Sequence, residues 1–222
     1  MLRQLLSALR SGEVLDEAFA QFHEMIDHAK WMFLRANEVL HEPAKAETVR
    51  DALYERDRKI NELLRSIRRK IVRHLTIHPG SDVAASLALM SVARDAERIG
   101  DYCKNVFEVG QFYREEFHVT RYHEPLEEIR RQVEGLFDAV DRAFADSNVA
   151  AARRVVESSH QMRLRCDAVI EQLLRDEAKI QTHEAVAYSL LARHYKRVAA
   201  HLANIATAVF GKIEDLDFRP GG

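Results

Sequence analysis

The stretch ARDAERIGDYCKN, residues 93–105, places Glu97 and Asp101 one helical turn apart with a glycine between them. Residues four apart on an α-helix share a face, so both carboxylates point to the same side. A second stretch, ARHYKRVAAHLAN at residues 192–204, repeats the alanine, both arginines and the asparagine at the same relative positions, but a lysine and an alanine replace the acids. The chain therefore carries one helical pattern twice and keeps the acidic pair in one copy.

Apolar residues recur with a helical period through almost the whole chain, and only 8 glycines and 4 prolines interrupt 222 residues. The pattern predicts six long helices, separated by short stretches rich in proline, glycine, serine or asparagine. The ADSN stretch is expected to cap the fifth helix, and Pro125 fits the first position of the fourth. The predicted helices span residues 14–40, 44–76, 82–117, 125–144, 149–180 and 182–213.

The two halves of the chain align with each other. The third predicted helix maps onto the sixth with an offset of 99 residues, and the second maps onto the fifth with an offset of 106. A repeat of this length is too long for a solenoid unit and fits a duplicated three-helix bundle. We therefore predict an all-α fold of two tandem, pseudo-symmetric three-helix bundles, with residues 1–119 as the first repeat and 120–222 as the second.

Composition narrows the class of protein. The net charge of −2 and pI of about 6.6 argue against a dedicated nucleic-acid binder, which would carry a basic excess. No run approaches the roughly 20 apolar residues of a membrane span, so work at a membrane would need a partner. Cys103 and Cys166 are lone thiols outside any CxxC pattern, which is typical of the reducing cytoplasm.

The acids of the first half point to a cation. Asp57 occupies a seam position of an otherwise apolar stripe, where an unpaired carboxylate would cost several kcal/mol. Asn61 lies one turn later, and Glu97 and Asp101 lie on the shoulder of the neighbouring stripe. Oxygen ligands converging between two helices are what a hard cation takes. The alternative is that arginines, namely Arg58, Arg94 or Arg98, pair with these acids.

The second half serves as an internal control. Asp57 maps to Arg163, Asn61 to Asp167, Glu97 to Lys196 and Asp101 to Ala200. Cationic side chains thus replace two of the candidate ligands. We expect one of them to neutralise Asp167, and the second copy to have lost any metal site, although drift of a solvated face would give the same pattern.

Residues 55–108 resemble the first repeat of the PhoU family. The resemblance rests on an acid-x-x-x-Asp motif within an ERIGD run, a D-x-x-I run on the preceding helix, and a proline and Ser-Asp before the motif helix. It extends over nearly the whole chain but is less specific in the second half. The matching residues here are Asp57, Ile60, Asn61, Pro79, Ser81, Asp82, Glu97, Asp101 and Asn105.

The resemblance implies two tandem three-helix bundles that act in the cytoplasm, at the inner face of the membrane through a transporter. It implies a non-enzymatic accessory and negative regulator of inorganic phosphate transport and phosphate-starvation signalling. The implied partners are the ATPase of a phosphate ABC transporter, a phosphate-sensing histidine kinase and a second copy in a homodimer. The implied cofactor is a divalent metal or iron, held in the first repeat by Asp57, Asn61, Glu97 and Asp101.

Two departures from the family pattern leave alternatives open. Position 61 holds asparagine where an acid is usual, and the second motif lacks both acids. An accessory protein of a different phosphate carrier, such as a sodium-coupled one, would look similar. A di-metal bundle enzyme would use Glu-x-x-His pairs, which this chain has at Glu38–His41, Glu115–His118 and Glu157–His160.

Two further features fit either a structural or a binding role. Residues 65–74, RSIRRKIVRH, form a basic stretch that is either a solvated face or a contact for an acidic partner. His201 lies beside the altered second motif, and we interpret it as an ordinary core or surface histidine.

Overall fold

The computed structural model describes residues 13–175, 180–211 and 216, and within these residues it forms six α-helices and no strand. The predicted all-α fold is therefore confirmed. Two short 3₁₀ turns, η2 (Pro43–Lys45) and η3 (Ala208–Phe210), accompany the helices. The helices are α2 (Glu13–His41), α3 (Ala46–Ile77), α4 (Val83–Phe112), α5 (Thr120–Ala145), α6 (Val149–Arg175) and α7 (Thr182–Thr207).

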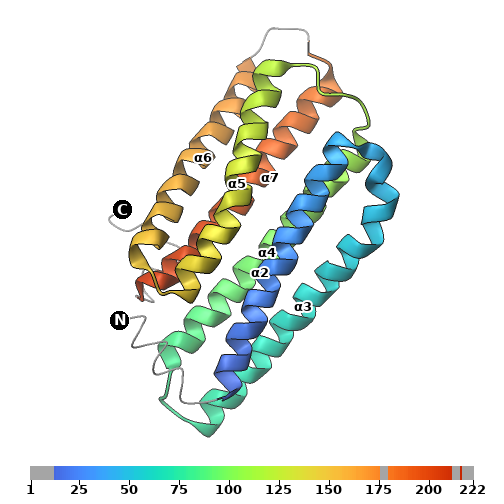
Figure 1. Ribbon diagram of the computed structural model, residues 1–222. Coiled ribbons are helices and arrows are strands. Elements are labelled where there is room, and N and C mark those ends of the chain that lie inside the picture. Colours follow the sequence, from blue (N-terminus) through green and yellow to red (C-terminus); the bar gives the residue numbers. More distant parts are fainter. Residues whose placement is uncertain (1–12, 176–179, 212–215, 217–222) are drawn as a thin grey trace.

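The helices pack as two bundles side by side. α2, α3 and α4 pack against one another, and so do α5, α6 and α7 (Figure 1). The bundles meet mainly where α4 lies against α7, with a smaller contact between α2 and α5. α4 and α7 are the third helices of the two repeats, so the two halves are joined by equivalent helices. The boundary between residues 119 and 120 stays a prediction.

The predicted apolar stripes form one continuous core. On α4 every residue of the stripe is at most 1% exposed, and on α7 each equivalent residue is at most 4% exposed. Full burial of one such aliphatic side chain contributes about 1.5–3 kcal/mol, so these stripes hold the fold in both copies. The α4 stripe consists of Leu89, Val92, Ala96, Ile99, Cys103 and Val106, and the α7 stripe of Tyr188, Leu191, Tyr195, Val198, Leu202 and Ile205.

Three helix ends differ from the prediction. α4 ends at Phe112 and not at 117, because Tyr113 turns into an extended backbone and its hydroxyl donates to the carbonyl of Glu116 at 3.0 Å. α5 begins at Thr120 and not at 125. α7 ends at Thr207 and not at 213, because the chain gives way to η3 and then to Gly211 with a positive φ. α6 ends in the described residues at Arg175, and residues 176–179 before its predicted end at 180 are not described.

The earlier start of α5 places Pro125 inside the helix, where its missing N–H removes one backbone hydrogen bond. The extra turn carries Tyr122, which is 1% exposed and lies with its ring 5.7 Å from that of Tyr188. Burial of this ring offsets the lost bond. The fifth helix begins as predicted, because Oδ1 of Asn148 accepts a hydrogen bond from the backbone N–H of Ala151 at 3.0 Å.

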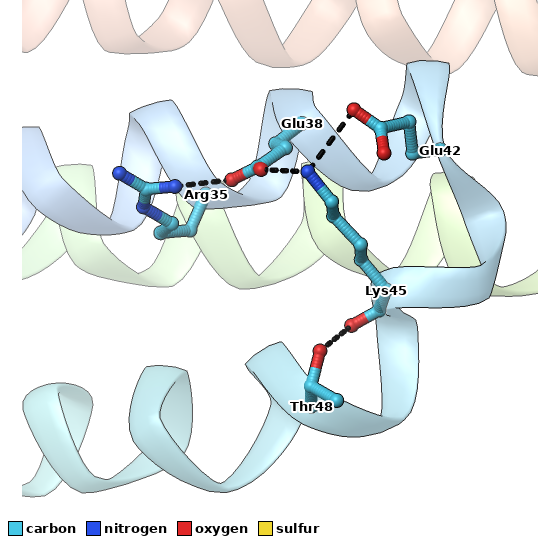
Figure 2. A network of polar contacts seen from close by, with 5 residues as sticks. All are labelled: Arg35, Glu38, Glu42, Lys45 and Thr48. Atoms are coloured by element: carbon cyan, nitrogen blue, oxygen red, sulfur yellow. Dashed lines mark hydrogen bonds and ion pairs between the residues drawn. The ribbon is translucent and has the colours of Figure 1, made fainter.

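A polar network holds the turn between α2 and α3 (Figure 2). Lys45 in η2 reaches back to two acids at the end of α2: it contacts Glu38 and donates to Glu42 at 3.0 Å. Arg35 contacts Glu38 from the other side. The hydroxyl of Thr48 donates to the carbonyl of Lys45 at 2.8 Å. These contacts fix the point at which the chain reverses direction.

One glycine sets the distance between α2 and α4. A Cβ built on Gly110 would lie 3.1 Å from backbone atoms of Val39 and Leu40, which cannot move without shifting α2. A Cβ on Gly135 in α5 would meet nothing within 4 Å. The two glycines therefore make a matched pair in which only one is required by packing.

We predict that Gly110→Ala lowers the free energy of unfolding by about 1–3 kcal/mol, because the added methyl forces the two helices apart. Gly135→Ala should raise it by about 0.5–1 kcal/mol, because alanine favours an exposed helix position over glycine. Chemical denaturation of both variants checks this. A Gly110→Ala variant as stable as the parent would show that α2 and α4 are not in close contact.

Candidate functional site

The predicted site lies between α3 and α4, and a lysine stands at its centre. The ammonium of Lys104 lies 2.9 Å from Oδ1 of Asp57 on α3 and 2.9 Å from Oδ1 of Asp101 on its own helix. Gly100 lies where the two helices pack closely, and a Cβ there would meet the end of the Ile60 side chain of α3 at 3.1 Å. The acid on the apolar seam is thus paired by a lysine, which is neither the predicted metal ion nor one of the arginines of the alternative.

The other two predicted ligands point elsewhere. The amide of Asn61 donates to the backbone carbonyl of Asp57 at 3.1 Å, within α3. The carboxylate of Glu97 has its ion pair with Arg98, at 3.9 Å. The fold brings Asp57 and Asp101 together through Lys104, whereas Asn61 and Glu97 line a separate hollow beside them.

The electrostatics favour a charged lysine. Partial burial alone would lower the pKa of Lys104, but the hydrogen bonds to Asp57 and Asp101 and the charges of both acids outweigh it, so its pKa is raised. The pKa of Glu97 is also raised, first because it is partly buried and second because Asp101 repels its charge. The cation at this site is therefore supplied by the chain itself.

The donor set as arranged does not fit a resident metal ion. An ammonium lies between the two carboxylates that would have to share the metal, and the third predicted ligand is a neutral amide turned to its own backbone. Among the described residues no three His, Cys, Asp or Glu side chains gather as a metal site would require. The metal predicted from the sequence stays a prediction.

In the second repeat a lysine again contacts an acid. The ammonium of Lys196 on α7 lies 2.5 and 2.6 Å from the two carboxylate oxygens of Asp167 on α6. The expectation that a cationic side chain neutralises Asp167 is therefore confirmed. Arg163, the other cationic replacement, is exposed. The two lysines come from different positions of the repeat, since Lys104 corresponds to Ala203.

A polar cluster that the sequence did not reveal joins the two bundles. Asp95 on α4 is 7% exposed, and its Oδ1 contacts Nδ1 of His201 at 2.6 Å and the amide of Asn204 at 3.1 Å, both on α7. The ring of Tyr102 stacks on that of His201 with centroids 5.7 Å apart. His201 is thus the partner of a buried acid, at a partly buried position that agrees with the predicted structural role.

The repeat itself held the signal for this cluster. With the offset of 99, Tyr102 corresponds to His201 and Asp95 corresponds to His194. The cluster obeys that relation, because Tyr102 on α4 faces both histidines of α7, its ring centroid lying 6.0 Å from that of His194. The contact of Asp95 with His201 therefore has its counterpart in the contact of His194 with Tyr102, as a two-fold relation between the repeats requires.

An apolar hollow opens between the end of α4 and the start of α7. Its volume is about 950 Å³. Phe112, which is 79% exposed, lines it together with Val186 and Leu190, which are 52% and 39% exposed. Exposed apolar side chains that gather around a hollow are typical of surfaces that bind another protein.

The Glu-x-x-His pairs do not converge. Glu38 contacts Arg35 and Lys45 at the end of α2, Glu115–His118 lies between α4 and α5, and Glu157–His160 lies within α6. The described residues therefore give no support to the di-metal enzyme. The molecule belongs to the class of all-α proteins built from two pseudo-symmetric three-helix bundles whose polar groups pair across helix seams.

Comparison with known proteins identifies the family within that class. A family model described as the PhoU domain matches residues 22–109 and again residues 126–209. The chain therefore belongs to the PhoU family. The two matched segments contain most of the helices of the first and the second bundle respectively.

Individual proteins show the same relationship. The chain is 24% identical over 209 residues to a phosphate-specific transport system accessory protein PhoU homolog from Synechocystis sp., covering 90% of this chain and 84% of that relative. It superposes on PhoU from Pseudomonas aeruginosa with a TM-score of 0.70 and 21% identity, over 95% and 97% of the two chains. Its superposition on the phosphate transport system regulatory protein PhoU from Streptococcus pneumoniae has a TM-score of 0.71 at 16% sequence identity, and covers 89% of this chain and 95% of that chain.

We predict that Lys104→Gln lowers the free energy of unfolding by about 1–2 kcal/mol, because two partly buried carboxylates lose their counter-charge. Added Mg²⁺ or Mn²⁺ should raise the melting temperature of this variant more than that of the parent. Lys59→Gln, a more exposed lysine on α3, is the control and should change neither quantity.

The same protein allows the metal to be measured directly. We expect the parent, purified without chelator, to carry less than one equivalent of metal. One equivalent that disappears in Glu97→Ala/Asp101→Ala would contradict this expectation and establish the site predicted from the sequence.

We predict a pH effect at the seam between the bundles. Burial, and then the charge of Arg193, lower the pKa of His194 to about 4, and its Nδ1 is buried without a hydrogen-bond partner among the described residues. The unfolded chain takes up this proton near pH 6.5, so the contribution of neutral His194 to stability is complete above that pH and is lost as the pH falls toward 4.

Denaturation curves of the parent and of His194→Gln, recorded at about pH 7.5 and about pH 5, isolate the effect. The parent should lose more stability than the variant between the two values. Equal losses would show that His194 is accessible to protons in the folded protein.

Proposed function

We propose that this protein is a non-enzymatic regulatory accessory protein of inorganic phosphate transport. The observation that carries the proposal is the match of the PhoU domain to both halves of the chain. The descriptions of the similar proteins, an accessory protein of a phosphate-specific transport system and a phosphate transport system regulatory protein, give the process. A sodium-coupled carrier or a di-metal enzyme is not favoured, since neither description refers to one.

The proposal includes the partners and the place of action. The protein would act in the cytoplasm and contact the ATPase of a phosphate ABC transporter and a phosphate-sensing histidine kinase, and two copies would form a homodimer. No helix among the described residues is both long enough and apolar enough to cross a bilayer. Regulation would then proceed by contacts between protein surfaces.

The apolar hollow between α4 and α7 is the surface on which we place the contact with the transporter ATPase. Phe112 lines the hollow and leaves most of its ring in water. Exposure of this apolar surface is unfavourable, and a bound partner would bury it. Glu108, Arg114 and Glu115 at its edge supply the polar rim that surrounds the apolar centre of typical interfaces. These features support a protein partner over a small ligand.

We predict that deletion of the gene changes phosphate uptake and the output of a phosphate-starvation reporter, and that the parent gene restores both. Phe112→Asp should fail to restore them while keeping its circular dichroism and melting temperature, because it changes only an exposed contact residue. Leu174→Asp, at a leucine that is 83% exposed on α6 and lies outside the hollow, is the matched control and should restore both.

Unchanged uptake and unchanged reporter output in the deletion strain would refute the regulatory function. Full restoration by Phe112→Asp would refute only the contact surface.

A further inference from the structure

A small polar hollow between α3 and α4 is lined by four arginines. Its volume is about 250 Å³. Two of its arginines come from α3, within the basic stretch of the sequence, and two from α4. The lining residues are Asn61, Leu64, Arg65, Arg68, Arg94, Glu97 and Arg98.

The arginines of this hollow have few acidic partners among the described residues. Arg65, Arg68 and Arg94 make no salt bridge or side-chain hydrogen bond to any described residue, and Arg98 has only Glu97, at 3.9 Å. The shortage is local, because the whole chain carries 35 acids against 33 basic residues, and arginines elsewhere, such as Arg130 and Arg165, pair with glutamates. Four guanidinium groups around one carboxylate leave an excess of positive charge that attracts an anion.

The second repeat shows that this arrangement is not a by-product of the fold. Arg94 and Arg98 recur there as Arg193 and Arg197, but the α3 arginines do not recur. With the offset of 106, Arg65 corresponds to Glu171 and Arg68 to Leu174 on α6. Glu171 moreover pairs with Arg175 at 2.7 Å. The first repeat alone therefore brings arginines from both helices to one hollow.

The chemistry of the lining indicates which anion fits. Guanidinium groups recognise tetrahedral oxyanions through paired N–H donors. At about 30 Å³ for each water molecule, the hollow has room for about eight waters, which suits one small oxyanion with part of its hydration. A carboxylate among the arginines would repel an anion that has no proton, but it accepts a hydrogen bond from an anion that carries one.

We infer that the hollow lined by Arg65, Arg68, Arg94 and Arg98 binds inorganic phosphate as hydrogenphosphate, with the arginines holding its oxygens and Glu97 accepting the hydrogen bond of its P–OH group. Sulfate has the same shape but carries no proton at neutral pH, so Glu97 disfavours it. Phosphate monoesters near pH 8 are disfavoured for the same reason. The amide of Asn61, at the edge of the hollow, adds a neutral donor or acceptor.

The site goes beyond the regulatory function proposed above and does not rest on it. Phosphate binding is a property of the purified protein, whereas regulation is read from a deletion strain. If both hold, the protein that regulates phosphate transport would itself bind the transported ion, at a hollow that shares no lining residue with the apolar hollow between α4 and α7.

Isothermal titration calorimetry of the full chain with sodium phosphate tests the inference. We expect one phosphate per chain. Arg65→Gln/Arg68→Gln should weaken binding about tenfold or more, because two paired-donor contacts are lost. The matched control is Arg69→Gln/Arg73→Gln, which changes the net charge equally on the same helix but at residues outside the hollow, and it should stay within about twofold.

Selectivity provides the second measurement. The parent should bind sulfate about tenfold more weakly than phosphate, and Glu97→Gln should bind both alike, because a neutral amide can accept or donate. All substituted residues are exposed or partly exposed, so the variants should fold.

Several results would overturn the inference. They are no detectable binding at about 10 mM phosphate, equal weakening by both double arginine variants, and no preference for phosphate over sulfate. Binding to phosphatidylglycerol vesicles without binding of free phosphate would also overturn it, and would assign the basic face to a membrane surface.

Discussion

The packing of α4 against α7 is the contact on which both bundles depend. α4 touches α2 and α3, and α7 touches α5 and α6, so each of the two is packed against every other helix of its own bundle. A polar cluster lies in their seam, where Asp95 of α4 is held by His201 and Asn204 of α7. Because an unpaired buried carboxylate costs several kcal/mol, a shift of one helix along the other would be penalised at this one residue.

The same logic of pairing explains the acids of the first repeat. Asp57 sits on an apolar seam and cannot remain alone, and Lys104 reaches it from the facing helix while also holding Asp101. In the second repeat Lys196 pairs with Asp167, whose side chain is about half exposed. Both copies therefore have an acid–lysine contact between their second and third helices. The lysines occupy non-equivalent positions of the repeat, so the geometry of the contact differs between the copies.

Much of the fold could be predicted because the stripes are local and strong. Every stripe residue of α4 and α7 that the periodicity indicated is buried. The errors fell where tertiary contacts overrule local signals: Pro125 marks a helix start by its own chemistry, but burial of Tyr122 on Tyr188 extends α5 by more than a turn beyond it. Likewise, the spacing of Glu97 and Asp101 predicts that they share a face of the helix. It does not predict that Lys104 joins only Asp101 to Asp57.

The sequence by itself determined that the chain is helical, that its two halves repeat and that the acids are separable from the apolar stripe, because periodicity and internal alignment depend only on the order of residues. The tertiary structure decided which charges meet. Lys104 lies three residues beyond Asp101, and its side chain could equally have pointed to solvent; only the packing of α3 against α4 places Asp57 2.9 Å from it. The same approach gathers arginines of α3 and α4 around one hollow, since distances between helices are set by packing and not by spacing along either helix.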